Sequence, residues 1–231
     1  MCGYVERQRS LATTVYRDYL SSLGVNELPL GRFFPKTTMS GVIIQRETAI
    51  EVVDAIWWFK LQWEDGRYKP MAKVTSFNAR NLSNNLWKKP VKTHRCIIPA
   101  TAIVETIEDK DNPKKKHSYL MDSPSGMLLG GLYAEYKNND GDTTYSCAVI
   151  TLNPHDRFSK YHNKATPLFL PLDNKILDLW LEPSFQDFDF FRGFIDTPEL
   201  PVAFNVTEVS NSQKLIPLGA TECLDHDDTQ S

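Results

Sequence analysis

The sequence predicts an α+β domain built on a mixed, barrel-like β core and flanked by several helices. Predicted strands are spread over most of the chain, helical patterns stand at the start and near the end, and parallel βαβ alternation is absent. The 231 residues are 41% hydrophobic, which suits one sizeable domain with a packed core. We expect this domain to span residues 1–218, followed by an acidic, flexible tail over residues 219–231.

Local patterns place the individual elements. β-branched and aromatic residues alternate or cluster in seven predicted strands: 41–46, 50–59, 96–106, 117–121, 127–137, 144–152 and 201–209. Helical signals predict four helices: 11–23, 82–88, 173–181 and 184–191. Ser10 and Asp173 are the expected N-caps of two of them, and Gly24 is the expected stop of the first. Asn138–Gly141 reads as a hairpin turn, whereas residues 25–40 and most of 64–95 read as loops.

Composition excludes several classes of protein. No apolar run approaches the ~18 residues of a membrane span, and the polar N-terminus is unlike a signal peptide. The four cysteines lie far apart without a CxxC pair, which argues against a zinc site and a disulfide framework. There is no Gly-rich phosphate loop. We expect an intracellular, monomeric protein that does not bind a membrane, a metal or a cofactor.

Charge is distributed unevenly along the chain. The net charge is −3, but residues 57–95 hold nine Lys and Arg against two Asp and Glu, a local charge of +7. Residues 182–231 hold ten acids against two bases, a local charge of −8. The basic stretch is compatible with an anion-binding face, and an ordinary solvated surface explains it equally well.

The first three residues, Met1-Cys2-Gly3, carry the most distinctive chemistry. If Met1 is removed, Cys2 bears a free α-amine and a thiol on adjacent carbons. These groups titrate near ~7.7–8.0 and ~8.5, so both are nucleophilic at neutral pH. Together they can close a five-membered ring on an aldehyde, or the amine can act as base for the thiol. A cysteine at position two is also commonly accidental, so the tripeptide alone decides nothing.

Three polar residues in the middle of the chain are candidates to work with Cys2. Asn78 can hydrogen-bond a carbonyl or hydroxyl group without titrating, and Arg80 can donate two hydrogen bonds to one phosphate. Glu105 ends an apolar run, where burial would raise its carboxyl pKa and make it a proton donor near neutral pH. The alternatives are a common turn sequence and a strand-end glutamate that faces solvent.

Histidines and aromatic residues complete the set of candidates. His155 and His162 follow a predicted strand, and histidine is the usual proton shuttle at neutral pH, although most single histidines are surface residues. Trp63 and Pro35 lie in polar loops, where an exposed indole would stack on bases while nearby cations bind phosphates. No one of these features identifies a function by itself.

The order of these residues resembles the SOS-response-associated peptidase (SRAP) family. The resemblance runs from residue 1 to about residue 210 and is carried by Met1-Cys2-Gly3, Asn78-Ala79-Arg80, Arg95-Cys96-Ile97-Ile98-Pro99-Ala100 leading to Glu105, His162 ahead of Pro167-Leu168-Phe169-Leu170, and Phe204-Asn205. It implies an SRAP-like barrel. Members of the family recognise abasic sites in single-stranded DNA and link to them through the N-terminal cysteine as a thiazolidine.

The resemblance also implies roles for residues of this chain. Cys2 would supply the amine and thiol to the ring-opened sugar, and Asn78 would position the α-amine or the sugar. Glu105 would move protons during Schiff-base formation and ring closure, and His162 would assist sugar opening and reversal of the crosslink. Four residues would contact the DNA: Arg80, Trp63, Pro35 and Lys164. Autoproteolytic removal of Met1 and a weak lyase activity are implied as well.

The chain departs from the family pattern at several positions. Tyr4 replaces the usual arginine, the glutamate that commonly follows the NAR tripeptide is missing, and Thr106 replaces the usual tryptophan. The family's H-x-R-x-P has become His162-Asn163-Lys164-Ala165-Thr166-Pro167. His155 opens a better copy of that motif, but we assign the role to His162 because its distance from the preceding strand and the apolar run after it fit.

Two other functions use the same residues. An N-terminal nucleophile amidohydrolase or peptidase would attack an amide with Cys2, with its own amine as base. A catalytically decayed module would keep the fold and the DNA groove and bind single strands without a covalent product.

Overall fold

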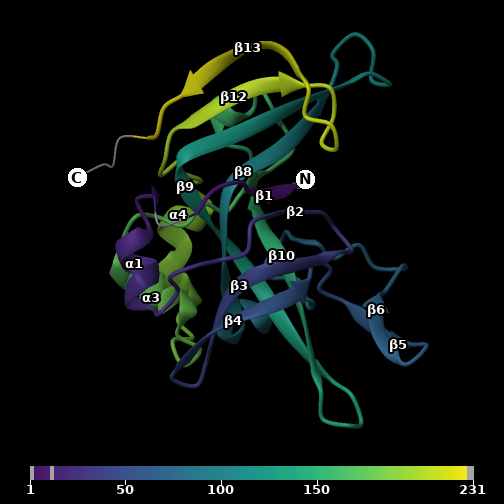
Figure 1. Ribbon diagram of the computed structural model, residues 1–231, viewed down its shortest axis with the longest axis vertical. Coiled ribbons are helices and arrows are strands. Elements are labelled where there is room, and N and C mark those ends of the chain that lie inside the picture. Colours follow the sequence, from purple (N-terminus) through teal and green to yellow (C-terminus); the bar gives the residue numbers. More distant parts are fainter. Residues whose placement is uncertain (1–2, 11–12, 228–231) are drawn as a thin grey trace.

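The computed structural model describes residues 3–10 and 13–227 (Figure 1). Its strands are β1 (Val5–Arg7), β2 (Gly31–Phe33), β3 (Thr38–Arg46), β4 (Ala49–Ile56), β5 (Leu61–Glu64), β6 (Arg67–Pro70), β7 (Asn78–Ala79), β8 (Arg95–Glu108), β9 (Lys116–Lys137), β10 (Thr143–Leu152), β11 (Thr166–Pro167), β12 (Phe204–Val209) and β13 (Pro217–Leu224). The helices are α1 (Arg17–Ser22), α2 (Pro90–Thr93), α3 (Asn174–Leu181) and α4 (Arg192–Asp196), with 3₁₀ turns η2 (Asp156–Phe158) and η3 (Phe188–Phe191). The predicted α+β class is confirmed.

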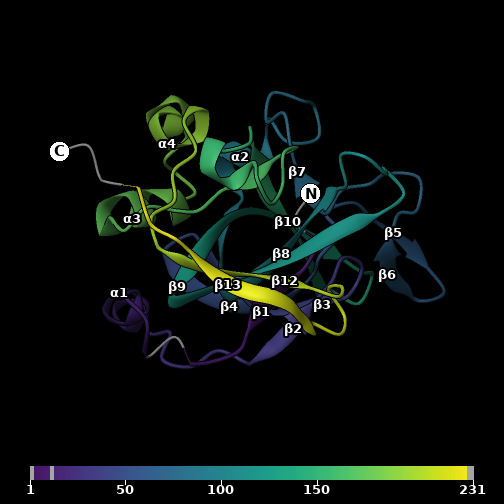
Figure 2. The ribbon, with the colours of Figure 1, turned by 90° about the horizontal axis from the view of Figure 1, so that it is seen from above.

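A closed ring of strands forms the centre of the molecule (Figure 2). The ring runs β9, β10, β4, β3, β8, and it closes because β8 also pairs with β9. β10 and β4 are parallel, with Tyr145 opposite Ala55, while the other neighbours in the ring are antiparallel. The mixed, barrel-like core predicted from the sequence is therefore present.

The β8–β9 pair continues beyond the ring as a two-stranded ribbon. A register shift between Ala100 and Ala102 marks the point where the ribbon leaves the barrel, as an irregularity in an antiparallel ladder bends the strands. The extension gains β1 and β2 on the β8 side and β12 and β13 on the β9 side. β8 thus runs from the barrel core at Cys96 to the extended sheet at Glu105.

Close packing inside the ring depends on a glycine. Gly131 lies opposite Cys96 on one side and Val149 on the other. A Cβ atom at this position would lie 2.8 Å from Cys96 Sγ and 2.9 Å from the Ala148 carbonyl oxygen, both shorter than real contacts. The absence of a side chain lets β8 and β10 approach β9 closely enough to close the ring.

Several predicted elements are confirmed with shifted ends. The strand predicted at 41–46 begins three residues earlier, at Thr38, and the two predicted at 117–121 and 127–137 are one continuous strand, β9. The Asn138 side chain accepts bonds from the backbone of Asp140 and Asp142, which closes the predicted hairpin turn. The Asp173 carboxylate caps α3, as expected from the sequence.

Other predictions were wrong in a local way. The predicted loops contain β2, β6 and the turn of the β5–β6 hairpin, where Asp65 and Gly66 both have positive φ. Asp-Gly is a strong hairpin signal that the loop prediction overlooked. The first helix begins only at Arg17, because β-branched residues precede it, and Tyr16 rather than Ser10 is its N-cap.

Two more helix predictions were displaced. Residues 82–88 form turns, and the helix α2 starts after them at Pro90, since proline suits the first helical turn. The helix predicted at 184–191 is replaced by η3 and α4, over residues 188–196. None of the described helices is long and apolar enough to cross a membrane.

The C-terminal residues join the sheet. The predicted boundary at residue 218 falls inside β13, which pairs antiparallel with β12 from Pro217 to Leu224. Beyond it, the Asp227 backbone N–H donates to the Leu200 carbonyl oxygen at 2.9 Å. Residues 219–227 are thus held by strand pairing and hydrogen bonds, and residues 228–231 lie outside the described part of the chain.

Arg95 links the barrel to the helical layer. Its buried guanidinium donates to six carbonyl oxygens, three of which belong to residues at the end of α3: Leu179, Trp180 and Glu182 at 3.2, 2.6 and 2.7 Å. The remaining acceptors are Val91, Lys92 and Phe185. A cation here satisfies helix carbonyls that have no partner within the helix.

We predict that Arg95→Met lowers the free energy of unfolding by about 3 kcal/mol or more, because several buried carbonyl groups lose their donor. Urea unfolding followed by circular dichroism measures this. Arg17→Met is the matched control, since Arg17 is exposed and its ion pair within the described part of the chain is with Asp18, and we expect a change below about 0.5 kcal/mol. Equal stability of the two variants would contradict the structural role of Arg95.

Candidate active site

Glu105 is buried between strands at the centre of the candidate site. It stands opposite Tyr119 of β9 and is 0% exposed, so the solvent-facing alternative is wrong. β1 flanks β8 on the other side, with Val5 opposite Ile103 and the Val104 N–H bonded to the Tyr4 carbonyl at 3.4 Å. Followed toward the N-terminus, the antiparallel register brings the start of the described chain beside Glu105. Cys2 and Met1 lie outside the described residues.

Tyr4, which stands where the family has arginine, is an internal anchor. Its side chain is fully buried, and its hydroxyl donates to Glu6 Oε2 at 2.5 Å. Burial and the neighbouring Glu6 carboxylate raise the pKa of Tyr4, which keeps the phenol protonated as a donor. Arg32 closes the group with a 2.8 Å bond to Glu6 Oε1, and Phe34 packs edge-on to the Tyr4 ring.

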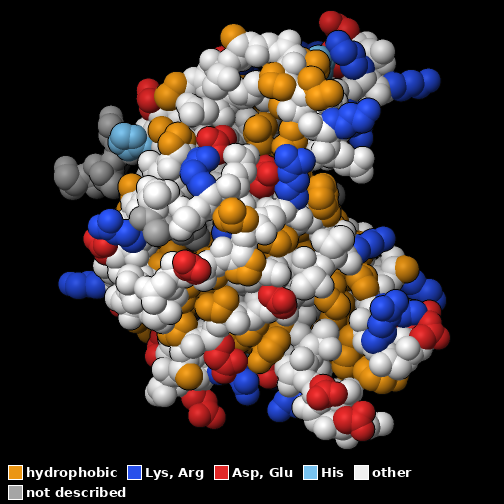
Figure 3. Space-filling view, in the orientation of Figure 1, with side chains coloured by type: hydrophobic (Ala, Val, Ile, Leu, Met, Phe, Trp, Pro, Cys, Tyr) orange, Lys and Arg blue, Asp and Glu red, His pale blue; other side chains and the backbone are white. Residues whose placement is uncertain are grey.

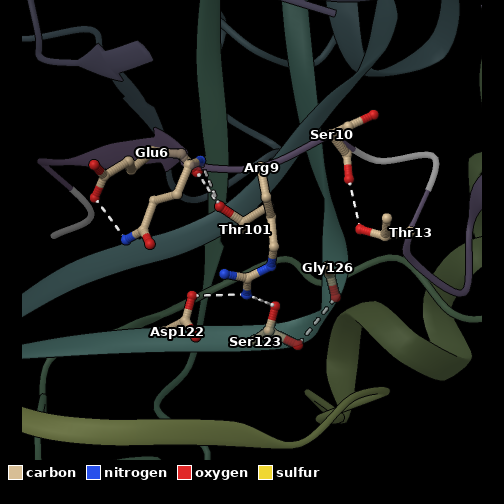
Figure 4. Close-up of polar contacts among 9 residues, drawn as sticks. Glu6, Arg9, Ser10, Thr13, Thr101, Asp122, Ser123 and Gly126 are labelled. Atoms are coloured by element: carbon tan, nitrogen blue, oxygen red, sulfur yellow. Dashed lines mark hydrogen bonds and ion pairs between the residues drawn. The ribbon is translucent and has the colours of Figure 1, made fainter. Parts of the chain in front are cut away.

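Further polar contacts fix β1 against the ribbon (Figure 4). The Gln8 N–H donates to Thr101 Oγ1 at 2.9 Å, and the same hydroxyl donates to the Glu6 carbonyl at 3.3 Å. Arg9 reaches across to β9, where it bonds Asp122 at 2.8 Å and the Ser123 carbonyl at 2.6 Å. The strand that follows the candidate nucleophile is thus tied to both β8 and β9.

His162, in the segment that follows β10, lies next to Glu105. Its Nδ1 atom is 2.8 Å from the Thr106 carbonyl oxygen and 3.6 Å from Glu105 Oε2, and the side chain is 4% exposed. A carbonyl oxygen can only accept, so Nδ1 carries the proton in the neutral ring. Nε2 is then the nitrogen with a lone pair, and it is the atom that can take up a proton.

The protonation state of His162 follows from its surroundings. Burial lowers its pKa to about 4, and the positive charges of Lys164 and Arg80 act in the same direction. The ring is therefore neutral at pH 7. The Asn78–Arg80 segment lies beside β10, the strand that precedes the His162 segment.

The segment that carries His162 is packed on both sides. The His162 N–H donates to the Phe158 carbonyl at 3.0 Å, and the Phe158 ring is buried against Phe169 and Phe204. Tyr161 packs edge-on to Tyr119, the cross-strand partner of Glu105, and its hydroxyl donates to Glu222 of β13 at 3.0 Å. The last strand of the sheet thereby supports the histidine.

Asn78 lies in β7, in parallel register with Val149 of β10. The two residues before it are held firmly. The Trp57 indole donates to the Phe77 carbonyl at 2.8 Å, and Ser76 binds the backbone of Phe59 and Lys60, each at 2.9 Å. These bonds fix an otherwise polar loop against the barrel and present Asn78 half-buried.

The predicted DNA contacts are distributed around the site. Arg80 is exposed, whereas Lys164 forms a 3.0 Å ion pair with Glu108. Trp63 is 52% exposed on β5 and packs edge-on to Tyr68. Pro35 is half-buried in the turn between β2 and β3. Hydrophobic and basic side chains gather over the β5–β6 hairpin (Figure 3). The structure therefore brings Glu105 and His162 together, whereas Trp63 lies on β5 and Pro35 in the turn between β2 and β3.

The alternative histidine has a different role. His155 caps η2 by accepting a bond from the Arg157 backbone, and its Nε2 atom is 3.1 Å from Asp227 Oδ2. Asp227 also pairs with Arg157. His155 is thus engaged with the C-terminal segment, which supports the choice of His162. No group of His, Cys, Asp and Glu among residues 3–10 and 13–227 is arranged to hold a metal ion.

Several supporting residues carry no signal in the sequence. Tyr119, Tyr161 and Glu222 surround the Glu105–His162 pair but come from three distant segments. Tyr4 is recognisable only as a departure from the family pattern, and its partner Glu6 looks like a surface residue. Their importance depends on contacts between strands that local patterns do not reveal.

Solved structures share this fold. A protein from Bordetella bronchiseptica aligns over 91% of this chain and 100% of its own, with a TM-score of 0.61 and 17% identity. One from Bacteroides thetaiotaomicron gives a TM-score of 0.60 at 15% identity, covering 91% and 93% of the two chains. The barrel with its extended ribbon is thus a fold that these solved structures share.

The chain belongs to the SOS response associated peptidase (SRAP) family, whose model matches residues 1–212. Two relatives in Bacillus subtilis (strain 168) carry the name abasic site processing protein. YobE is 27% identical over 168 residues, covering 68% of this chain and 74% of its own. YoqW is 27% identical over 166 residues, covering 67% and 71%.

We predict that the buried neutral His162 makes stability depend on pH. Its folded pKa of about 4 lies below the ordinary value of 6.5, so the unfolded chain binds the proton first as the pH falls. The free energy of unfolding should therefore drop between pH 6.5 and 4 by on the order of 2–3 kcal/mol from this group. Urea titrations of the native protein and His162→Gln isolate the effect, and parallel pH profiles of the two would contradict it.

Proposed function

We propose that this protein binds abasic sites in single-stranded DNA and forms a thiazolidine crosslink through Cys2, which shields the lesion. The family membership and the names of the Bacillus relatives support an abasic-site role. The observation that carries the proposal is the buried Glu105–His162 pair, 3.6 Å apart, beside the strand that follows the N-terminal cysteine.

The chemistry requires a free N-terminal cysteine. Hydrolysis of the Met1–Cys2 amide, by the protein itself or by an aminopeptidase, supplies it. The α-amine adds to the aldehyde carbon of the ring-opened sugar, and loss of water gives a Schiff base. The thiol then adds to the imine carbon while its proton passes to nitrogen. Aldehyde, amine and thiol thus become a thiazolidine and one water molecule, with no oxidant or reductant.

Each residue of the site has a separate role in this reaction. Glu105, buried beside the start of β1, delivers a proton to the departing hydroxyl and takes it back on reversal. His162 accepts protons at Nε2 because its Nδ1–H is held by the Thr106 carbonyl. Asn78, fixed through Phe77, orients the amine or the sugar without titrating. Arg80 contacts a phosphate, and Trp63 contacts a base, of the nucleotides that flank the lesion on the same strand.

The direct test mixes purified protein with single-stranded DNA that carries one abasic site and resolves the products under denaturing conditions. We expect a denaturant-stable adduct, abolished in Cys2→Ala. Cys223→Ala is the matched control, because Cys223 is an exposed thiol on β13 and should leave the adduct unchanged. Intact-mass measurement of the protein from its native host reports whether Met1 is lost. A native protein that forms no adduct would refute the proposal.

Glu105→Gln keeps the size of the side chain and removes proton exchange. We predict that it slows adduct formation at saturating DNA by about 10²-fold or more, the usual contribution of a general acid. Glu51→Gln, a half-buried glutamate on β4, serves as control and should retain the native rate. An unchanged rate in Glu105→Gln would exclude Glu105 from the proton transfers.

The peptidase name of the family supports a second candidate, an N-terminal nucleophile hydrolase. Here the Cys2 thiol attacks an amide carbonyl with its own amine as base, releasing an amine and leaving a thioester that water cleaves. Turnover of a peptide with a trappable acyl-enzyme, and no DNA adduct, would favour it. Salt-dependent binding of single strands without either product would identify a module that has lost catalysis.

A further inference from the structure

A pocket of about 640 Å³ lies next to the candidate site and shares Arg80 with it. Its walls come from the loop after β7, from α2, from the end of β10 and from the segment around η3 and α4. α2 and α4 lie on the same side of the ring as β7 (Figure 2). Arg80 lines the pocket two residues after Asn78, so the pocket opens directly beside the proposed lesion site. Its volume is within the range of small-ligand sites.

The pocket lining carries more cations than carboxylates. Arg80, Lys88 and Lys92 line it, and among residues 3–10 and 13–227 no carboxylate pairs with any of the three. The fourth cation, Arg192, is neutralised by Asp189 at 2.6 Å and Asp196 at 3.6 Å. Four cations against three carboxylates, Asp187, Asp189 and Asp196, leave the lining with a small positive excess that suits a phosphate group.

The lining also includes an aromatic ring and several side-chain amides. Phe188 is half-buried and packs against Phe191 with ring centroids 6.1 Å apart, so its ring is held by the core rather than free in solvent. Gln186, Asn81 and Asn153 line the same pocket with side-chain amides that can both donate and accept. A flat aromatic ring with amides around it matches the face and the edges of a nucleobase.

A buried polar group in the pocket wall points to a ligand independently. The Thr151 side chain is 3% exposed, and its hydroxyl has no hydrogen-bond partner among the described residues. A buried hydroxyl without a partner costs free energy, which a polar group of a bound molecule would recover. Thr151 belongs to β10 and pairs with Pro167, five residues after His162, so it joins the pocket to the candidate site.

We propose that this pocket holds the nucleotide next to the lesion on the same DNA strand, with its phosphate on the Arg80 side and its base against Phe188. The inference rests on the proposed function and extends it from the lesion to its neighbour. The base of the neighbouring nucleotide then makes stabilising contacts with the pocket, so the affinity for single-stranded DNA depends on the presence of that base.

The test uses equilibrium binding of single-stranded DNA that carries a tetrahydrofuran abasic analogue, which has no aldehyde and cannot crosslink. Three DNAs are compared: both neighbouring nucleotides intact, the 5′ neighbour without a base, and the 3′ neighbour without a base. We expect Phe188→Ala to weaken binding of the intact DNA by about fivefold or more, as for loss of one stacked base. It should not weaken binding of the DNA whose pocket-side neighbour lacks its base.

Control variants distinguish the loss of a pocket contact from a folding defect. Phe190→Ala removes a neighbouring phenylalanine that is 50% exposed and does not line the pocket, so it should bind all three DNAs like the native protein. Gln186→Ala changes an exposed side chain of the pocket and should show the same dependence on the base if Phe188→Ala does not fold. Lys88→Met should weaken all three DNAs equally, as expected of a phosphate contact.

Two results are decisive. Equal effects of Phe188→Ala and of Gln186→Ala on every DNA, including no effect, would overturn the pocket assignment. The proposed function is tested separately, because adduct formation on a natural abasic site uses an aldehyde that the analogue lacks. A protein that forms the adduct but shows no base dependence refutes only the pocket, whereas absence of the adduct refutes the function on which it rests.

Discussion

The long pairing of β8 with β9 is the constraint on which the rest of the structure depends. Its first half closes the barrel, and its second half carries β1 on one edge and β12 on the other. Arg95 at the start of β8 binds the end of α3, while Glu105 near its end faces the candidate site. Because one ribbon spans both regions, packing in the barrel core fixes where the carboxylate lies.

Electrostatics at the site follow from burial more than from ion pairs. Arg80 and Lys164 place positive charge near His162, and the buried ring stays neutral instead of adding to it. Burial thus keeps this imidazole uncharged at neutral pH although cations lie in the same part of the molecule. Tyr4 contributes in a similar way, since it occupies an interior position with a neutral donor where the family has a cation.

Elements with strong local signals could be predicted from the sequence. β3, β4, β8 and β10 follow clusters of apolar residues, and the Asn138 turn and the Asp173 cap follow from side chains that bond their own backbone. β13 could not be predicted, because seven of its eight residues are exposed and it shows no buried face. The Glu105–His162 pair was accessible only through the family resemblance, since 56 residues separate the two. The roles of Tyr4, Arg95 and Glu222 depend on distant partners and leave no local pattern.

β13 supports the His162 segment, so the complete site forms only after the C-terminal strand has been synthesised. Tyr161 hydrogen-bonds Glu222 and Arg157 pairs with Asp227, so this segment acquires its full set of contacts only when the last residues are in place. Synthesis proceeds from the N-terminus, and contacts between distant segments form late. A nascent chain therefore exposes its cysteine long before the supported histidine exists. The order of synthesis itself delays assembly of the complete site until the whole polypeptide has been made.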